Sequence, residues 1–473
     1  MKVLILNPPA YEGIKFIREG RCEQRLSSFQ YVMVPISLPS IAAVLRKSGH
    51  EVKIVDSIVE NYTEKQVKEE VEKFRPALVL VDMSTATFYG DLETIKKVKE
   101  VNGCHLTAIG THVTSLPEES LKTSLLDSVI RGEPEETALE LANTLDNGCN
   151  LVHVKGISFK ENGKVITNPG RPFIKNLDSL PFPARDLIKN EKYTMPISNR
   201  PYTLVITSRG CPNQCIYCTA HQYYGHKLRL RSPQNIIDEI EEVVKEHGVK
   251  DITMWSDTFT LDRAFVIDIC NEIKKRGLKF RWMANSRVDK VDPELLALMK
   301  SSGCKMLSFG VESGCQTILD NVRKKTTIEQ IEKAFKWCRQ AKIETIAHFV
   351  FGLPGETKET LEETLKLLKK IKPDYAQFYG AIPFPGTKFY ELAKKRGWLV
   401  TKDWSKFELN QNIVSTPSLS VEELRKAKEK AFRAFYFRPA YILKRLTRLR
   451  SVKEIINVPK QSLSFVKEWV KTK

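Results

Sequence analysis

The sequence lacks any long hydrophobic run. Its longest apolar stretches, 77–81 and 346–353, have the length of a β-strand and fall far short of the roughly 20 residues that span a bilayer. The segment from Met1 to Pro9 leads directly into a strand pattern, without the longer apolar stretch and cleavage site of a signal peptide. We therefore expect a cytoplasmic protein whose contact with a membrane, if any, is peripheral.

Cysteine is scarce outside one short window. Of the ten cysteines in 473 residues, three lie within 211–218, and the other seven are scattered without ligand spacing. A long intracellular chain is seldom held together by disulfides, so the scattered cysteines are expected to be small buried hydrophobes. The cluster of three instead indicates metal chemistry.

The composition is that of an ordered globular protein with an uneven charge. Hydrophobic residues make up 42% and charged residues 28%, and the length suggests two or three packed units. The net charge is +18, and 421–473 contains fifteen Lys and Arg against five Glu, so about ten of these charges lie there. Nucleic acid, an anionic membrane or an acidic partner would each explain such a segment.

The first 145 residues alternate strand and helix patterns. Strands are expected at 3–6, 52–55, 77–81, 107–109 and 128–130, with helices at 38–47, 63–74, 91–101 and 135–145 between them. This alternation predicts a five-stranded parallel sheet with helices on both faces, a Rossmann-like (flavodoxin-like) α/β domain. Ligands bind at the carboxyl ends of such strands. The residues there are Asn7, Pro8, Asp56, Ser84, Thr85, Gly110, Thr111, His112, Arg131, Gly132 and Glu133.

An irregular segment separates this unit from a second βα series. Asn162-Gly163 predicts a hairpin turn and the proline-rich 181–185 a stiff linker. Six further βα units follow, with strands near 203–207, 251–255, 281–285, 306–310, 347–351 and 375–378, which predicts a partial (β/α)6 barrel. The expected division is 1–148 for the Rossmann-like domain, 149–198 for the linker, 199–400 for the barrel and 401–473 for a basic helical region.

The cysteine window directly follows the first strand of the second series. Cys211, Cys215 and Cys218 are separated by three and then two residues. Three thiolates leave one iron of a 4Fe-4S cube without a protein ligand, whereas ordinary electron-transfer clusters have four. The alternative is a zinc site, for which a fourth ligand is required and His221 is the nearby candidate.

This spacing at the end of a first barrel strand resembles the radical S-adenosylmethionine (SAM) superfamily. The resemblance implies that Cys211, Cys215 and Cys218 bind the cluster and that the open iron binds the amino and carboxylate groups of SAM. An electron from the cluster then cleaves SAM to methionine and a 5′-deoxyadenosyl radical. The implied SAM contacts are Tyr217, Ser256, Asp257, Thr258, Arg287, Glu312, Ser313 and Gly352. The 255–260 segment departs from the glycine-rich form that this superfamily has after its second strand.

The first domain resembles the cobalamin-binding domain that is fused to many radical SAM enzymes, the class B methyltransferase-like branch. The likeness lies in 38–52, in Gly110-Thr111-His112 and in 131–135. It implies that the strand-end residues named above contact cobalamin. The string Asp-x-His-x-x-Gly, which supplies a histidine to cobalt, is absent, so cobalamin would be held without one. The alternative is a domain that binds no cofactor and only shapes the active site. The loop 15–22 is expected to face the junction of the two domains.

The basic region after 421 has three interpretations. Aromatic and apolar side chains alternate with Arg and Lys over 432–450, as in a helix lying on an anionic membrane. The same pattern is typical of a helix packed on the barrel with its basic face in solvent. The third interpretation, binding of RNA, is disfavoured. The methylthiolating radical SAM enzymes that act on tRNA need a second three-cysteine cluster in the first domain and a β-rich RNA-binding tail. Here Cys22, Cys104 and Cys149 are poorly placed for such a cluster, and the tail is predicted to be helical.

The resemblance implies a radical enzyme that excludes oxygen. Ferredoxin or flavodoxin would reduce the cluster, the 5′-deoxyadenosyl radical would take hydrogen from an unactivated carbon, and methylcobalamin would supply a methyl group. We expect a C-methylated product from a hydrophobic or lipid-like substrate. One alternative is ring closure, rearrangement or carbon–carbon coupling without methyl transfer, and another is a non-catalytic cobalamin or electron carrier.

Overall fold

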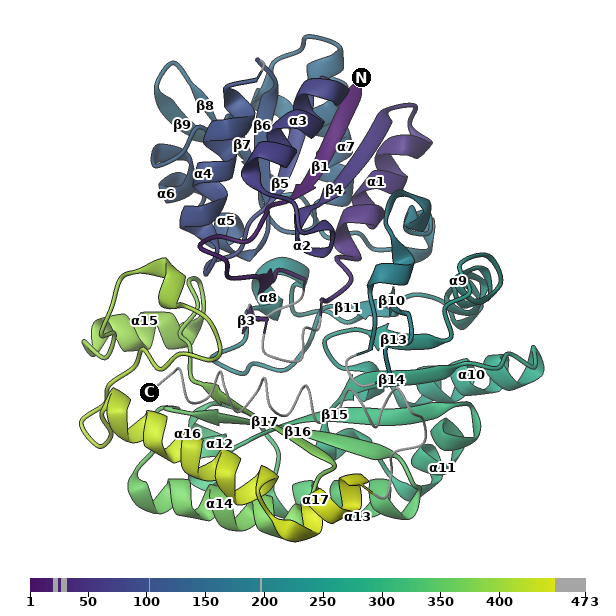
Figure 1. Ribbon diagram of the computed structural model, residues 1–473, viewed down its shortest axis with the longest axis vertical. Coiled ribbons are helices and arrows are strands. Elements are labelled where there is room, and N and C mark those ends of the chain that lie inside the picture. The colour runs from purple at the N-terminus through teal and green to yellow at the C-terminus, as the bar shows by residue number, and fades with distance from the viewer. Residues whose placement is uncertain (20–23, 27–31, 102, 196–197, 447–473) are drawn as a thin grey trace.

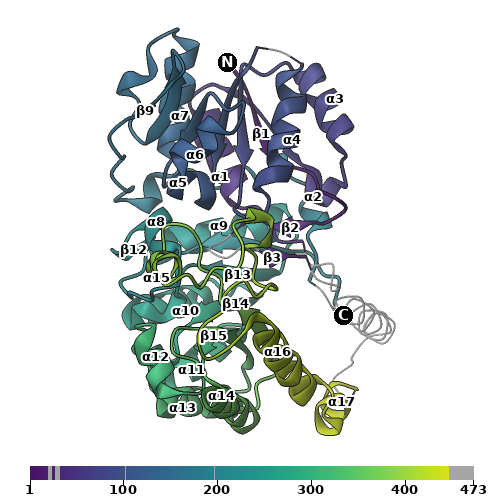
Figure 2. The ribbon, with the colours of Figure 1, turned by 90° about the vertical axis from the view of Figure 1, so that its left-hand side faces the viewer.

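Two parallel sheets, each with its own helices, make up the molecule (Figure 1). The computed structural model describes residues 1–19, 24–26, 32–101, 103–195 and 198–446. Figure 2 shows the first domain stacked on the second, with the short strands β2 (Phe16–Ile17) and β3 (Gln24–Arg25) at their junction.

The first sheet has five parallel strands in the order β4-β1-β5-β6-β7. They are β1 (Lys2–Asn7), β4 (Glu51–Asp56), β5 (Leu78–Asp82), β6 (His105–Ile109) and β7 (Ser128–Ile130). The chain reverses direction across the sheet at β1, which is the kind of place where α/β proteins bind ligands. The predicted Rossmann-like sheet is confirmed.

Two further strands extend this sheet beyond the five that the sequence predicted. β8 (Ile157–Glu161) pairs antiparallel with β7, and β9 (Lys164–Thr167) pairs antiparallel with β8. The turn at Asn162-Gly163 closes this hairpin with φ of 49° and 75°, the left-handed region that such turns require. The segment interpreted as a linker therefore contributes its first part to the sheet.

Alternate strand residues fill two separate cores. Val3 and Ile5 of β1 pack with helices α1 (Ser37–Lys47) and α7 (Glu135–Asp146). Leu4 and Leu6 point to the other face, where α3 (Glu64–Phe74) and α4 (Phe88–Lys99) lie. A sheet that is covered on both faces needs apolar side chains at every position, which explains the continuous hydrophobic runs in the sequence.

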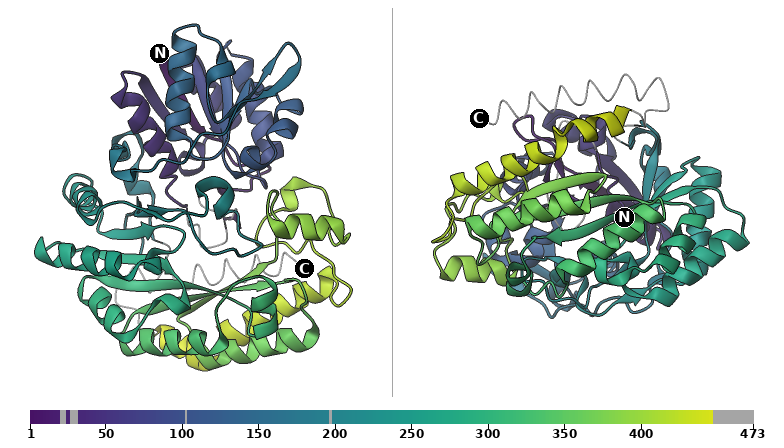
Figure 3. Two further views of the ribbon diagram at one scale, coloured as in Figure 1. Left: turned by 180° about the vertical axis from the view of Figure 1, so that it is seen from behind. Right: turned by 90° about the horizontal axis from the view of Figure 1, so that it is seen from below.

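The second sheet has six parallel strands in sequential order, so it is an open, partial barrel as predicted. The strands are β10 (Tyr202–Ile206), β13 (Asp251–Trp255), β14 (Arg281–Ser286), β15 (Cys304–Glu312), β16 (Glu344–Phe351) and β17 (Tyr375–Gly380). Helices α9 (Pro233–Glu246), α10 (Arg263–Lys275), α11 (Pro293–Ser301), α13 (Ile328–Gln340) and α14 (Lys358–Ile371) cover its outer face (Figure 3). Ser232-Pro233 and Asp292-Pro293 begin α9 and α11 with a capping side chain followed by proline.

The side chains of β14, β15 and β16 alternate between a buried and a half-buried environment. Ala284, Leu307, Phe309, Phe349 and Phe351 are buried among the outer helices. Their neighbours along each strand point to the opposite side of the sheet, because side chains alternate along a strand. We call this opposite side the inner face. Its half-buried members are Met283, Asn285, Met306, Ser308, Gly310, Ile346, His348 and Val350.

Helix α16 (Val421–Tyr436) packs on the edge of the barrel beside α14 and β17 (Figure 1). Phe435 is fully buried, its ring lies 6.5 Å from that of Phe378, and the Tyr436 hydroxyl donates to the carbonyl of Ala376 at 2.6 Å. This part of the basic region therefore packs on the barrel, the second of the three interpretations. The tail beyond Leu446 lies outside the described residues. Within the described residues, no helix is both long and apolar enough to cross a membrane.

Replacing Phe435 by alanine tests this packing. We expect F435A to lower stability by about 3–5 kcal/mol, because the change removes a buried ring and leaves a cavity. The thermal unfolding midpoint of the barrel reports the loss. F437A is the matched control, since Phe437 is 48% exposed, and should change the midpoint little. Equal effects of the two substitutions would contradict the assignment of α16 to the barrel core.

Candidate functional site

The cysteine loop is closed at its base by a small antiparallel pair. β11 (Ser208–Arg209) precedes the loop and pairs with β12 (Arg229–Leu230), which follows helix α8 (Ala220–Tyr224). Inside the loop, the amide of Cys211 donates to the Gly225 carbonyl and that of Cys218 to the Cys215 carbonyl, both at 3.2 Å. The 211–218 segment is therefore folded compactly at the carboxyl end of β10.

Gly210 is the residue that allows this closure. Its φ is 83°, and a Cβ atom there would lie 2.3 Å from the Lys227 carbonyl oxygen and 3.0 Å from that of Tyr224. Any other residue would strain the backbone and collide with backbone atoms that cannot give way. The sequence shows Gly210 beside Cys211, but only the structure shows why glycine is needed.

The donor set fits an iron-sulfur cube. Cys211 is buried, Cys215 and Cys218 are half-buried, and all three are thiols rather than halves of a disulfide. In the part of the chain that the structure describes, no three His, Cys, Asp or Glu side chains converge on a point where one metal ion could bind. A tetrahedral zinc site requires such convergence, whereas each thiolate of a cube binds a different iron. The His221 ring stacks on His226 at 3.9 Å and hydrogen-bonds the backbone of the cysteine loop at Cys211 and Asn213.

Tyr217 connects the cysteine loop to the end of β15. Its hydroxyl donates to the carboxylate of Glu312, which also accepts from Lys324 Nζ at 2.6 Å. Burial alone would raise the pKa of Glu312, but the Lys324 charge and these two hydrogen bonds hold that pKa below its usual range. Glu312 has a φ of 64°, and a Cβ on Gly310 would lie 2.3 Å from its Oε1. Lys324 was not predicted, since no motif surrounds it.

Three of the residues that the resemblance implied as SAM contacts bond to the protein itself. Arg287 donates through Nε to Asp289 at 2.9 Å and through Nη2 to the Lys324 carbonyl at 3.0 Å, so it holds the segment that presents Lys324. The Ser313 hydroxyl shares a hydrogen bond with Thr364 at 3.2 Å. The amide of Gly352 donates to Glu356 at 2.5 Å, and its φ is 101°.

The turn after β13 presents polar groups to a pocket. Ser256, Asp257 and Thr258 are all buried, and the Thr258 hydroxyl donates to the Asp257 carbonyl at 2.7 Å. The Ser256 hydroxyl is buried without a hydrogen-bond partner. Buried polar atoms are rarely left unpaired, so a polar ligand at this position would satisfy it. This unpaired hydroxyl fits the predicted contact with SAM.

The pocket lies between the two domains. Arg18, Glu19, Ser37, Asp82, Gly110 and Thr111 form its wall on the first domain, at the carboxyl ends of β1, β5 and β6. Ile206, Arg209, Thr219, Tyr223, Tyr224, Trp255, Ser256 and Asp257 are among those that form the opposite wall. The expectation that the loop after the first strand faces the junction is confirmed by Arg18 and Glu19, while residues 20–22 of that loop lie outside the described part of the chain.

Of the residues expected to contact cobalamin, Gly110 and Thr111 line this pocket. Gly110 has a φ of 124°, and a Cβ there would lie 2.0 Å from the Met83 carbonyl oxygen, so the turn after β6 requires glycine. Glycine lets the backbone approach a ligand closely at such a turn. These two positions, together with the placement of the pocket at the strand ends, fit a bound cofactor.

The other strand-end residues make contacts within the protein. Asn7 donates to Asp56 at 2.8 Å, and Asp56 also accepts from the Tyr193 hydroxyl at 2.7 Å. The Pro8 carbonyl accepts from Arg18 at 3.1 Å, and Arg131 donates to the Ile157 carbonyl at 3.2 Å. Further contacts of this kind join Ser84 to Thr87, Gly132 to Thr114 and Glu133 to Arg209. Thr85 is buried. These residues shape the sheet edge and the domain junction.

The structure places His112 away from the pocket. Its ring is fully buried between Phe88, at 4.4 Å between centroids, and Trp404, at 5.3 Å. Burial lowers the pKa of His112 to about 3, and neither ring nitrogen has a hydrogen-bond partner. Although adjacent in sequence to Gly110 and Thr111, His112 points into the core between α4 and the C-terminal region.

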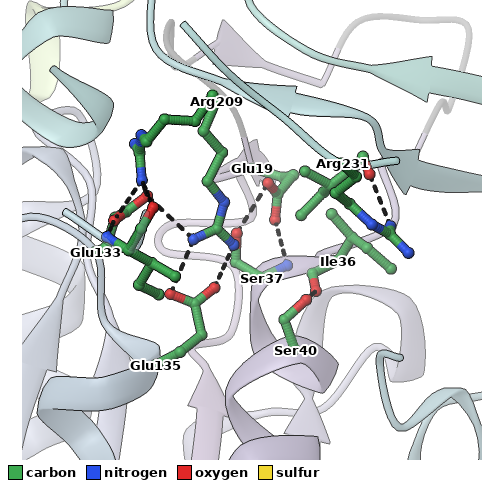
Figure 4. A network of polar contacts seen from close by, with 11 residues as sticks. Glu19, Ile36, Ser37, Ser40, Glu133, Glu135, Arg209 and Arg231 are labelled. Atoms are coloured by element: carbon green, nitrogen blue, oxygen red, sulfur yellow. Dashed lines mark hydrogen bonds and ion pairs between the residues drawn. The ribbon is translucent and has the colours of Figure 1, made fainter. Parts of the chain in front are cut away.

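A buried network of charges joins the two domains (Figure 4). Arg209 of β11 donates to Glu133 and Glu135, each at 3.2 Å through Nη1, and Arg229 donates to Glu133 at 2.9 Å. Beside them, Glu19 accepts from the amide and hydroxyl of Ser37 at 2.9 and 3.0 Å. Burial raises the pKa of Glu19 to about 7, although Ser37 and the charge of Arg209 act in the opposite direction.

Two family descriptions match the chain. The radical SAM superfamily matches residues 205–368, and the B12 binding domain matches residues 25–142. The radical SAM match begins in β10 and ends in α14, and the B12-binding match covers most of the first sheet. Residues of the B12-binding match line one wall of the pocket, and residues of the radical SAM match line the other.

Curated relatives align over most of the chain. An uncharacterized methyltransferase of Pyrococcus horikoshii is 34% identical over 94% of this chain and 94% of its own length. An anaerobic magnesium-protoporphyrin IX monomethyl ester cyclase of Rubrivivax gelatinosus is 31% identical, over 86% of this chain and 74% of the cyclase.

A solved structure has the same fold. The radical S-adenosylmethionine methyltransferase TsrM from Kitasatospora setae, with cobalamin and a [4Fe-4S] cluster bound, superposes with a TM-score of 0.71. The sequences are 17% identical, and the superposition covers 93% of this chain and 89% of that one.

Replacing Gly210 by alanine tests the construction of the cysteine loop. We expect G210A to retain less than half of the iron of the wild type after anaerobic reconstitution, because the new Cβ would meet the Lys227 carbonyl. G248A is the control, since Gly248 also has a positive φ of 67° but has nothing within 4 Å of its Cβ position. A full iron content in G210A would contradict this role.

The buried carboxyl of Glu19 predicts a pH dependence of stability. Because the folded state binds the Glu19 proton more tightly than the unfolded chain, the stability from protonated Glu19 is full below pH 4.5 and is lost as the pH rises to about 7. E19Q cannot lose a proton, so its free energy of unfolding should fall less over this range, by roughly 3 kcal/mol. Denaturant unfolding at several pH values measures both proteins, and parallel curves would contradict the assignment.

Proposed function

Since this chain belongs to the radical SAM superfamily and carries a B12-binding domain, we propose that it is a cobalamin-dependent radical SAM methyltransferase. It cleaves SAM reductively and methylates an unactivated carbon of a hydrophobic substrate. The pocket between the domains is the observation that carries the proposal, because residues of both matched regions line it. When bound, the cluster and SAM supply a 5′-deoxyadenosyl radical and cobalamin supplies the methyl group.

The residues around the cluster have three roles in this proposal. Cys211, Cys215 and Cys218 bind three irons, and the half-buried Tyr217 fixes the loop against β15 through the buried Glu312. Ser256, Asp257 and Thr258 hold SAM at the pocket wall. Arg287, Ser313 and Gly352 position these groups, since each bonds to the protein around them. Ser256, Asp257, Thr258, Arg287, Glu312 and Ser313 are buried, which limits the access of water to this part of the site.

The first domain contributes the opposite wall. Gly110 and Thr111 bring backbone close to cobalamin, and Asn7, Pro8, Asp56, Ser84, Thr85, Arg131, Gly132 and Glu133 support the sheet edge around it. His112 is buried between Phe88 and Trp404, so it is not among the residues that would hold cobalamin. The division into 1–148, 149–198, 199–400 and 401–473 belongs to the same proposal, and both family matches fall inside its first and third parts.

The inner face of the barrel supports a hydrophobic substrate. The strand segments 283–285, 306–311 and 346–350 contain no Lys, Arg, Asp or Glu. Met283, Met306, Ile346 and Val350 supply apolar surface on this face. A phosphorylated or nucleotide-like substrate needs cationic partners, and Lys324, the cation beside Gly310 on this face, is already paired with Glu312. An uncharged and largely apolar molecule needs no such partner. Ferredoxin or flavodoxin supplies the electron, and peripheral membrane contact through the C-terminal region, 401–473, stays a prediction.

Similarity to a cyclase supports a second candidate, a radical ring closure without methyl transfer. The Rubrivivax gelatinosus cyclase is 31% identical to this chain, close to the 34% identity of the Pyrococcus horikoshii methyltransferase. The two candidates differ in whether the product gains a methyl group and in the fate of the methyl of SAM.

Product analysis tests the proposal. The protein is reconstituted anaerobically with iron, sulfide and hydroxocobalamin, then incubated with SAM, dithionite and uncharged polycyclic lipids. We expect about four iron per chain, a corrin absorption band, release of 5′-deoxyadenosine and a product that is heavier by one methyl group.

The outcomes separate the candidates. C215A, which lacks one cluster ligand, should release no 5′-deoxyadenosine. Full iron and 5′-deoxyadenosine release without a corrin band or a methylated product would contradict methyl transfer and favour the ring closure. A wild-type protein that binds both cofactors but never cleaves SAM would contradict both and leave a carrier of cobalamin or electrons.

A further inference from the structure

Arg209 reaches from the cysteine loop into the first domain. Only Gly210 separates it from Cys211, and its side chain is 3% exposed. Its Nη1 atom lies 3.2 Å from both Glu133 Oε1 and Glu135 Oε2, and Nη2 donates to Glu135 Oε1. Both carboxylates stand at the start of α7, so the charge that precedes the cysteines is paired across the domain junction (Figure 4).

The same guanidinium also contacts the other end of the cysteine loop. It lies over the ring of Tyr224, 5.2 Å from the centroid, and Tyr224 ends the helix that follows Cys218. The backbone at Gly210 packs against the carbonyls of Tyr224 and Lys227. Arg209 and Tyr224 therefore lie at the two ends of the cysteine loop and contact each other. A movement of Glu133 and Glu135 relative to the barrel would move Arg209, and through it both ends of the loop.

Arg209 compensates the buried negative charges of Glu133 and Glu135 at the domain junction. Glu133 and Glu135 are buried, Glu133 also pairs with Arg229, and Glu19 adds a third buried carboxyl nearby. Removing one partner of a buried ion pair leaves an uncompensated charge, whereas removing both partners does not. Neutralising Arg209 alone would therefore open the junction more than neutralising Arg209 and Glu135 together, which leaves the Arg229–Glu133 pair intact.

We propose that Arg209 is a positioning residue that makes the geometry of the cysteine loop depend on the first domain. Through it, the cluster and cobalamin affect one another across the pocket. This inference rests on the proposed function, in which the loop holds the cluster and the first domain holds cobalamin. Coupling of this kind is reciprocal, so it should appear both in cobalamin affinity and in the spectrum of the cluster.

Two measurements that need no substrate test this inference. Hydroxocobalamin is titrated into protein that carries the cluster, and the EPR spectrum of the dithionite-reduced cluster is recorded with SAM and without cobalamin. We expect R209Q to keep its iron, to bind hydroxocobalamin about tenfold more weakly and to give an altered spectrum. R209K retains the charge but cannot donate through two nitrogens at once, so its hydroxocobalamin affinity should lie between those of R209Q and the wild type.

A charge-neutral variant and a matched control make the result specific. R209Q/E135Q removes one charge of each sign and keeps the Arg229–Glu133 pair, so it should regain most of the lost affinity. R171Q is the control, because Arg171 also pairs with α7, through Glu140 and Thr137, but lies outside the pocket. It should stay within about twofold of the wild type.

Each remaining outcome decides the inference. R209Q with the affinity and spectrum of the wild type would overturn it, as would an R209Q/E135Q variant no better than R209Q. If R209Q loses its iron, E135Q takes its place, since Arg209 then still pairs with Glu133, and an unchanged spectrum and affinity in E135Q would overturn the inference. A wild-type protein that binds neither iron nor hydroxocobalamin would instead refute the proposed function.

Discussion

The structure depends on two parallel sheets that direct their carboxyl ends toward the same junction. Loops that follow parallel strands all leave at one edge, so each sheet brings side chains from distant parts of the sequence together. Here the loops after β1, β5 and β6 face those after β10 and β13, and they enclose the pocket. Each domain therefore contributes one wall of the pocket, an arrangement that suits a reaction in which two cofactors act side by side.

Buried charge holds the junction together. Arg209 and Arg229, from the barrel side, pair with Glu133 and Glu135 of the first domain. Such pairs add little net stability when compared with apolar packing, but they penalise every arrangement that leaves one partner unpaired. They therefore favour one relative placement of the two domains. The half-buried inner face of the barrel carries Met and Ile side chains, and the Lys324–Glu312 pair lies beside it at Gly310.

The sequence predicted the parts of the fold that repeat. Strands that are buried on both faces appear as apolar runs, which is why 77–81 and 203–207 lie within one residue of β5 and β10. The hairpin of β8 and β9 was read only as a turn, because its exposed second strand carries few apolar residues. The cysteine spacing located the loop, while Lys324 and the contacts of Arg209 depend on tertiary geometry that no local pattern contains. His112 was predicted as a cofactor contact because it follows Gly110 and Thr111, but its side chain points into the core beside Phe88.

The central claim is that both cofactors occupy the pocket between the domains, and pulsed EPR tests it most directly. The protein is loaded with cluster and cobalamin, then reduced so that the cluster and the cobalt are both paramagnetic. The account predicts a magnetic interaction between the two centres, which should disappear when cobalamin is omitted. Two independent signals without any interaction would contradict it.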